Sequence, residues 1–330
     1  MPKTADRPSR GRLLRRGAAV ALLLALAGYL VGQYLTGGRT APRCRVVQAD
    51  GGGASYEFTA EQAVNAATIS AVGTSRKMPE RAVTIALATA LQESGLRNLG
   101  HGDRDSLGLF QQRPSQGWGD RGQIMDPVYS SQQFYKHLAE VPGYSRLPLT
   151  VAAQRVQRSG YPQAYAKHEP DATLLAAALT GRAAAGLSCE GRPGIEPGDP
   201  ERVRTALVRD FGRGILPESS ATGSGKSAGG GKGGSGDKGD GDTVTVPVPA
   251  SGDPAAGTPR RRGWALAHWA VANSSALRIE KVTYAGREWR ASDDGPGPWR
   301  EVSPDKGSGA GGSSPGEGGG AGEVRIGVGE

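Results

Sequence analysis

The sequence has few aromatic and sulfur-containing side chains from which to build a core. Aromatic residues make up 5% of the 330 residues, with four phenylalanines, and there are two cysteines and three methionines. Because large apolar side chains supply most of the burial in a domain, we expect one modest core. The 53 glycines, which concentrate after residue 212, shorten the foldable part further.

Metal-binding patterns are also missing. The sequence has four scattered histidines, namely His101, His137, His168 and His268. Neither they nor the cysteines stand at the spacing of a zinc site. The stretch HGDRDS at 101–106 lacks the further oxygen ligands and the closing glutamate of a calcium loop. We therefore expect no metal and no cofactor.

The net charge of +8 does not form a nucleic-acid-binding pattern. The cations are divided among RPSRGRLLRR at 7–16, PRRR at 259–262 and scattered positions. No basic stripe interleaved with aromatic residues and no reader motif is present. We expect a solvated surface and a membrane-flanking cluster, and no nucleic-acid partner.

An uncharged stretch stands near the N-terminus. Residues 17–36, GAAVALLLALAGYLVGQYLT, have about the length that a helix needs to cross a bilayer. The basic segment 1–16 precedes them, so the positive-inside rule predicts a single-pass cell-membrane protein with a cytoplasmic N-terminus and an extracytoplasmic main part. A cleaved signal peptide, with its site after Ala27, is the alternative and would give a secreted form. The apolar run continues past that site, which favours an uncleaved signal-anchor.

If the main part of the chain is exported, its two cysteines are exposed to an oxidising environment. Cys44 and Cys189 are the only thiols of the chain. In an oxidising compartment two such cysteines are expected to form a disulfide.

Helix signals dominate the region between residues 59 and 190. Thr59 and Gln62 read as a capping box, and Pro79 suits the first turn of a second helix that stops near Gly95. Asp126 followed by Pro127 predicts another helix start. Since no segment alternates convincingly with period two, we expect a mainly α fold class with a small helical domain.

The rest of the chain is expected to contain little structure. Residues 214–262 and 303–330 are rich in glycine, serine and proline, and are predicted to be a linker and a disordered tail. Between them, 263–302 predicts a helix followed by a hairpin, a small α+β module of unidentified partner. The expected order is a basic tail 1–16, an anchor 17–36, a juxtamembrane segment 37–58, a helical domain 59–190, a connecting segment 191–213, the linker, the module and the tail.

Glu93 is the most informative single residue. The helix that precedes it buries small apolar residues and delivers this carboxylate at its C-terminal end. The negative pole of the helix dipole and partial burial both raise a carboxyl pKa. A protonated glutamic acid is what a glycosidase needs to protonate a leaving oxygen. The alternative is a solvent-facing residue at a helix end.

The stretch QES at 92–94 and the following SLGLFQQRPSQ at 106–116 together resemble the lysozyme-like soluble lytic transglycosylase superfamily. The match includes an exported actinobacterial group with an ATALQES…GDRDSLGLFQQRPSQGWG core. The resemblance implies a lysozyme-like helical domain at 59–190 that acts on peptidoglycan glycan strands.

The resemblance also implies roles for residues of the site. Glu93 would be the general acid and then the base, and Ser94 an orienting hydroxyl. Gln111 or Gln112 would donate to the acetamido group of the sugar or to the glutamate, and Ser106 belongs to the same motif. In such enzymes one carboxyl suffices, because the 6-hydroxyl of muramic acid attacks and closes a 1,6-anhydro ring.

Some features depart from the family pattern. Phe110 replaces the usual methionine, and the third motif, Ala-Tyr-Asn-Ala-Gly, is only echoed in VAAQRVQRSGYP at 151–162. Gln154 and Gln157 stand there in place of its tyrosine and asparagine. Trp118 is predicted either to stack on a sugar or to close the fold.

The sequence leaves two questions about function open. Ordinary glycoside hydrolysis uses two carboxyl groups, and Asp103 or Asp105 is the candidate for the second in a muramidase. We expect a peptidoglycan-active protein that cleaves the MurNAc-GlcNAc bond. The alternative is a non-catalytic cell-wall glycan-binding or scaffold protein.

Overall fold

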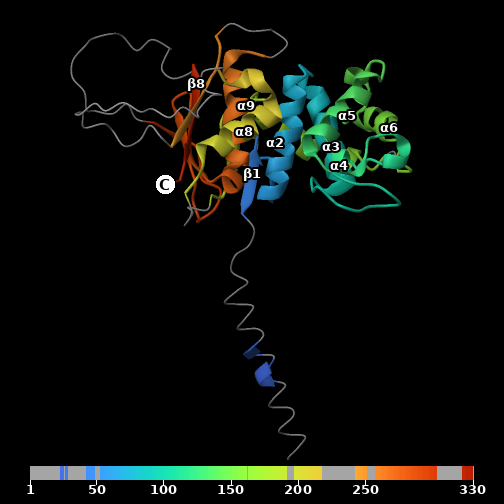
Figure 1. Ribbon diagram of the computed structural model, residues 1–330, viewed down its shortest axis with the longest axis horizontal. Helices are drawn as coiled ribbons and strands as arrows, with labels where there is room; N and C mark the ends of the chain where they lie inside the picture. The colour runs from blue at the N-terminus through green and yellow to red at the C-terminus, as the bar shows by residue number, and fades with distance from the viewer. Residues whose placement is uncertain are drawn as a thin grey trace, which may run out of the picture. The chain divides into compact units, whose positions relative to one another are not determined.

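The computed structural model describes residues 23–25, 27–28, 42–48, 53–161, 163–191, 197–217, 242–250, 257–302 and 322–329 (Figure 1). The basic tail 1–16 and most of the expected anchor 17–36 lie outside the described residues. Within the described residues, no helix is both long and apolar enough to cross a membrane. Residues 42–330 form one compact unit, and the fold described below is that of this unit.

The predicted helix starts are confirmed. Helix α2 (Ala60–Ser75) begins at a capping box, in which Gln62 N donates to Thr59 Oγ1 over 3.3 Å and Thr59 N donates to Gln62 Oε1 over 2.8 Å. Helix α3 (Glu80–Ser94) follows Pro79 and ends at Gly95, whose φ of 62° is left-handed. Such side-chain caps satisfy the backbone donors that the first turn of a helix leaves unpaired.

The remaining helical elements of the first half pack around α2 and α3. They are η1 (Pro114–Gln116), α4 (Arg121–Ile124), α5 (Pro127–Ala139), η2 (Tyr144–Arg146), α6 (Leu149–Gln157), η3 (Ala166–His168) and α7 (Glu169–Leu179). Helix α8 (Pro200–Phe211) and η4 (Arg213–Ile215) follow. Helix α5 contacts α2, α3, α4 and α6, while α7 contacts α2 and α3. We call the elements from α2 to α8 the helical half; α3, α4, α5 and α6 lie near one another on the right of Figure 1.

The expected mainly α fold class was wrong, because the unit contains two antiparallel sheets. A three-stranded sheet has the order β2-β1-β3. Its strands are β1 (Arg43–Val47), β2 (Ser55–Thr59) and β3 (Leu187–Cys189). A five-stranded sheet has the order β4-β8-β5-β6-β7. Its strands are β4 (Thr243–Pro247), β5 (Ile279–Tyr284), β6 (Arg287–Arg290), β7 (Arg300–Glu301) and β8 (Glu323–Val328).

Two strands of the larger sheet come from segments that were expected to be disordered. Strand β4 lies inside 214–262, and β8 lies inside 303–330. Strand β4 alternates, with Val244 and Val246 buried, whereas β8 alternates only in its first half and is buried from Ile326 to Val328. These runs are so short, and their surroundings so rich in glycine and proline, that composition concealed the alternation.

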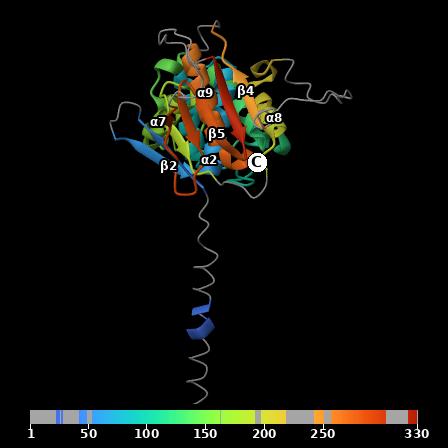
Figure 2. The ribbon, with the colours of Figure 1, turned by 90° about the vertical axis from the view of Figure 1, so that its left-hand side faces the viewer.

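The C-terminal region is continuous with the helical half and is not a separate small module. Helix α9 (Pro259–Ala272) contacts α2, α7 and β3 as well as β5 and β8 of the larger sheet, which lies in front of it in Figure 2. A short helix α10 (Ser274–Leu277) follows. The approach is close: a Cβ on Gly181, whose φ is +74°, would meet the carbonyl oxygen of Arg261 at 1.8 Å.

Buried polar contacts reinforce this junction. The Asp210 side chain on α8 is fully buried and accepts from Trp269 Nε1 over 2.8 Å and from Thr68 Oγ1 over 3.1 Å. His268 is likewise buried, and its Nδ1 lies 2.7 Å from Ala178 O. Burial lowers the pKa of His268 to about 4, so the ring is neutral at ordinary pH and serves in packing.

The predicted disulfide is confirmed. Cys44 and Cys189 are bonded and are direct partners in the antiparallel pairing of β1 with β3. Their separation of 145 residues means that the bond closes a long loop around the helical half.

Removing this loop closure should destabilise the protein strongly. For the double variant Cys44→Ala/Cys189→Ala we expect a loss of at most about 5 kcal/mol in the free energy of unfolding, from chain entropy. Guanidinium unfolding of the full-length chain measures it. Reduction of the wild-type protein should give a similar loss. An unchanged unfolding midpoint in both cases would contradict the expectation.

Candidate functional site

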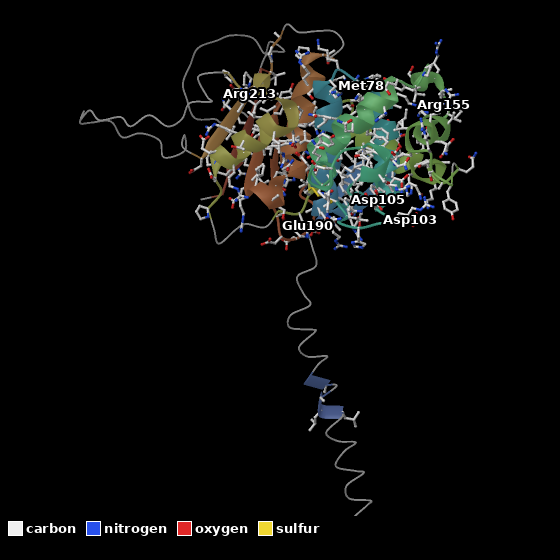
Figure 3. All side chains as sticks on the ribbon, turned by 45° about the vertical axis from the view of Figure 1, so that its right-hand side comes forward. Met78, Asp103, Asp105, Arg155, Glu190 and Arg213 are labelled. Atoms are coloured by element: carbon white, nitrogen blue, oxygen red, sulfur yellow. A yellow bond between two sulfur atoms is a disulfide. The ribbon has the colours of Figure 1, made fainter. Side chains whose placement is uncertain are left out.

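A cleft of about 850 Å³ opens in the helical half. Its walls come from the end of α3, the loop that carries the SLGLFQQ motif, the C-terminal end of α5 with the residues after it, and the end of α6 with the segment after it. Figure 3 shows Asp103 and Asp105 on the loop and Arg155 on α6. Such a cleft is large enough for a short stretch of polymer.

Glu93 lies in this cleft, in the last turn of α3. The residues that precede it on the same helix, such as Ala90, are fully buried. Burial raises the pKa of Glu93, while hydrogen bonds from Tyr165 and Gln157 oppose this shift in part. Such a carboxyl group keeps its proton to a higher pH than a solvated glutamate does, and the hydrogen bonds stabilise the carboxylate after the proton is given up.

Tyr165 is a site residue that the sequence analysis missed. Its ring is fully buried, and its hydroxyl donates to Glu93 Oε1 over 2.7 Å. Burial raises the pKa of Tyr165, and so does the neighbouring Glu93, so the phenol stays a donor. The sequence does carry a signal for it, because Ala164-Tyr165 matches the Ala-Tyr of the third motif and stands just after the segment 151–162.

The two glutamines proposed for the third motif have different positions. Gln157 ends α6 and lines the cleft; its Nε2 donates to Phe110 O over 2.7 Å, and the side chain also hydrogen-bonds Glu93. Gln154 instead donates to Ser159 O over 2.7 Å. Gln157 therefore links the glutamate to the wall that carries the second motif.

Replacing Tyr165 should change the titration of Glu93. In Tyr165→Phe the carboxylate loses a donor, so the pKa of Glu93 should rise further above its ordinary value. If the protonated form is the acid, the alkaline limb of the kcat/KM profile moves to higher pH, while the rate at the optimum falls by about tenfold because one orienting hydrogen bond is lost. Rates of glycan cleavage measured across pH check this. An alkaline limb that stays in place, or moves to lower pH, would contradict it.

Ser94 does not line the cleft. Its Oγ lies 2.7 Å from Leu109 O and 3.1 Å from Ala90 O, so it fastens the motif loop to α3. The loop also requires a glycine at Gly108, where φ is +75° and a Cβ would meet Ile124 O at 2.7 Å. Ser94 therefore positions the backbone of the loop, and it makes no contact with the cleft through which it could orient a bound sugar.

The motif glutamines face different surroundings. Gln111 lines the cleft, has a left-handed φ of 46°, and donates from Nε2 to Gly108 O over 3.3 Å. Gln112 is 2% exposed and donates to Ser130 O over 3.1 Å, while its Oε1 has no partner among the described residues. Among those residues neither glutamine hydrogen-bonds Glu93. Ser106 is nearly buried and lines the same wall.

The two candidate second carboxylates lie in unlike places. Asp105 accepts from Arg113 Nε over 2.7 Å and from Ser115 N over 2.9 Å, which hold its pKa well below the ordinary range, and it does not line the cleft. Asp103 lines the cleft, but its side chain is 92% exposed. Glu140, which the sequence analysis did not consider, also lines it and lies 3.5 Å from His137 Nδ1.

Two aromatic side chains line the cleft. Trp118 is partly buried, and its ring centroid lies 4.4 Å from that of His137. Tyr161 is 79% exposed and was not singled out in the sequence. Exposed aromatic faces of this kind suit the apolar face of a sugar ring, whose hydroxyl groups point outward.

The cleft has no arrangement for a metal ion, since the described residues include no group of three or more metal-ligating side chains. Its charged lining is mostly basic, with Arg104, Arg113, Arg155 and Arg158. The arrangement can deliver a proton from Glu93 to a bound polar polymer.

No protein-family model matches the chain, and no curated protein matches its sequence. The functional interpretation accordingly depends on the site itself and on the motif pair described above.

Proposed function

We propose that the protein is a cell-wall enzyme that cleaves the MurNAc-GlcNAc bond of peptidoglycan by the acid/base chemistry of Glu93. The observation that carries this proposal is a glutamic acid of raised pKa, hydrogen-bonded by Tyr165, in a cleft of about 850 Å³. The resemblance of QES and SLGLFQQRPSQ to the motifs of soluble lytic transglycosylases supports the same conclusion.

The reaction would proceed in two proton transfers. Glu93 gives its proton to the bridging oxygen as the C1–O bond of the muramyl residue breaks, leaving an oxocarbenium-like centre at C1. The resulting carboxylate, stabilised by Tyr165 and Gln157, then takes the proton of the muramyl 6-hydroxyl as that oxygen bonds to C1. The products are a 1,6-anhydro end and a free 4-hydroxyl, and Glu93 is protonated again.

This route is favoured over hydrolysis by the surroundings of the other carboxylates. Asp105 is bound to Arg113 and lies outside the cleft lining, while Asp103 and Glu140 line the cleft with side chains that are 92% and 62% exposed. None of the three combines a place in the cleft with a side chain fixed by burial, which favours a route with one carboxyl group. We therefore propose a lytic transglycosylase, with a muramidase as the second outcome of the same test.

The test uses the full-length chain and purified peptidoglycan. Mass spectrometry of the released fragments should detect anhydro-muropeptides. New reducing ends without anhydro products would indicate a muramidase that activates water. If neither product accumulates, the protein has no glycan-cleaving activity and the proposal is wrong.

A non-catalytic glycan-binding protein is the second candidate. Tyr161, whose ring is 79% exposed, and Trp118 both line the cleft and offer stacking surfaces that do not require Glu93. This candidate predicts that the full-length chain co-sediments with cell-wall material equally well with and without Glu93→Gln, and that neither form releases fragments.

The cellular location remains a proposal as well. We propose that residues 17–36 carry the rest of the chain across the membrane as a single-pass anchor. The disulfide between Cys44 and Cys189 supports an oxidising compartment outside the cytoplasm. Protease accessibility of the main unit in intact cells would test this, because a cytoplasmic protein would be protected.

A further inference from the structure

The basic side chains of the cleft are not equally available. Arg113 donates to Asp105 over 2.7 Å, and Arg104 lies 3.9 Å from Asp103. Arg155 and Arg158 are exposed, and neither makes an ion pair within the described residues. Two guanidinium groups are therefore free to bind an anion from the substrate.

Arg155 and Arg158 line the same cleft as Glu93. Arg155 lies in the last turn of α6, and Arg158 is the residue that ends the helix, with a left-handed φ of 51°. Gln157, between them in sequence, hydrogen-bonds Glu93 and Phe110 O. Because both arginines and Glu93 line the same cleft, an anion bound by the arginines would lie in the cleft that holds the proton donor. Figure 3 shows Arg155 on the surface of this helix.

The cleft lining also contains acidic side chains. Asp103 and Glu140 also line the cleft, and their side chains are 92% and 62% exposed. An acidic group on the substrate would be attracted to Arg155 and Arg158 and repelled by these carboxylates. A neutral strand would gain nothing from either.

We propose that Arg155 and Arg158 bind a carboxylate carried by the glycan, so that the cleft selects acidic glycan strands over neutral ones. This inference rests on the proposed function and adds its substrate class. A guanidinium group binds a carboxylate through two parallel N–H donors. Neutral hydroxyl and acetamido groups of a glycan can be bound by amide side chains and need no such cation.

Two sources could supply that carboxylate. One is the lactyl ether of muramic acid once its peptide has been removed, and the other is an acidic residue of an attached stem peptide. Three ligands distinguish them: peptide-bearing strands, strands whose peptides have been removed by an amidase, and neutral oligomers of N-acetylglucosamine.

Binding is best measured on the full-length chain with Glu93→Gln, so that cleavage cannot alter the ligand. In that background, Arg155→Gln/Arg158→Gln should weaken binding of the acidic strands by about tenfold and leave binding of the neutral oligomer unchanged. The matched control is Arg76→Gln/Arg202→Gln, which removes the same charge at exposed positions outside the cleft. It should change neither affinity.

Each result has a definite meaning. Loss confined to the peptide-bearing strands assigns the peptide carboxylate, and loss confined to the strands without peptides assigns the lactyl carboxylate. Loss on both acidic ligands shows that the two arginines accept either carboxylate. Equal affinity for all three ligands, no binding to any of them, or an equal loss in the control pair would overturn the inference. If the wild-type chain cleaves no glycan and the arginine-dependent preference persists, the proposed activity fails and the binding assignment stands.

Discussion

Glu93→Gln is expected to lower the rate of glycan cleavage by at least about 10³-fold. General acid–base catalysis contributes about 10²–10⁴-fold, and here one residue would serve both proton transfers. The amide has nearly the same shape but cannot give or take the proton. Release of muropeptides from purified peptidoglycan measures the effect. The matched control is Glu61→Gln, an exposed glutamate in the first turn of α2, which should keep full activity.

The same variant should not be destabilised, and its stability should depend less on pH than that of the wild type. Because burial raises the pKa of Glu93, the folded protein binds this proton more tightly than the unfolded chain does. Wild-type stability therefore falls as pH rises from the ordinary glutamate range through the raised pKa. Glu93→Gln lacks this loss, so its melting temperature should exceed that of wild type more at neutral pH than at acidic pH. The opposite order would show that Glu93 is not held in the protonated form.

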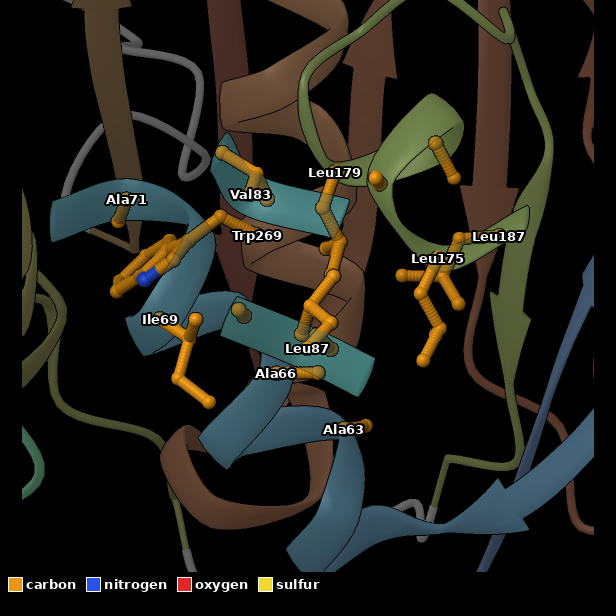
Figure 4. Close-up of a cluster of buried hydrophobic side chains, with 14 of the residues drawn as sticks. Ala63, Ala66, Ile69, Ala71, Val83, Leu87, Leu175, Leu179, Leu187 and Trp269 are labelled. Atoms are coloured by element: carbon orange, nitrogen blue, oxygen red, sulfur yellow. The ribbon is translucent and has the colours of Figure 1, made fainter. Parts of the chain in front are cut away.

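Truncation after Pro217 is expected to abolish the folded state. The shortened chain lacks α9 and the larger sheet, and α9 alone buries Trp264 and Trp269 almost completely. Figure 4 shows Trp269 beside Ile69 and Ala71 of α2, near Val83 of α3. Loss of a buried tryptophan side chain costs about 3–5 kcal/mol, and a domain is stable by about 5–15 kcal/mol in total.

Near-ultraviolet circular dichroism and limited proteolysis of residues 42–217 against 42–330 would measure this. We expect the longer chain to keep defined aromatic signals and protease resistance, and the shorter one to lose both. A milder variant, Trp269→Phe, should leave the protein folded but less stable, since Asp210 then loses the donor at 2.8 Å. Cooperative unfolding of residues 42–217 with an unchanged melting temperature would show that the helical half folds alone.

The helix starts were predictable because their signals are local. A cap such as that of α2 involves Thr59 and Gln62, three residues apart, so the sequence itself displays it. The cysteine pairing was predictable for a different reason, because only two thiols were available. The sheets were not predictable, since β4 and β8 pair with each other although they are far apart in the sequence. Nothing in the composition around either strand indicates which strand it pairs with.

Some features of the candidate site were likewise predictable from the sequence, and others required the structure. Glu93 could be named from its place at the end of a buried helix and from the motif pair. Its hydrogen-bond donor, Tyr165, stands 72 residues further along the chain. The pair Ala164-Tyr165 marks that residue in the sequence, but only the fold shows that its hydroxyl reaches Glu93. The distinction between Asp103 and Asp105 also required coordinates, since both precede the motif and only Asp105 is bound by Arg113.

The sequence by itself determined the local features of this protein: where its helices begin, that a carboxylate ends one of them, and that two thiols would meet. Only the tertiary structure decided which distant groups surround that carboxylate, and that the C-terminal strands and α9 complete the core of the helical half. Local features depend on neighbours within one helical turn. Contacts between distant segments depend on the path of the whole chain, and a single sequence does not display that path.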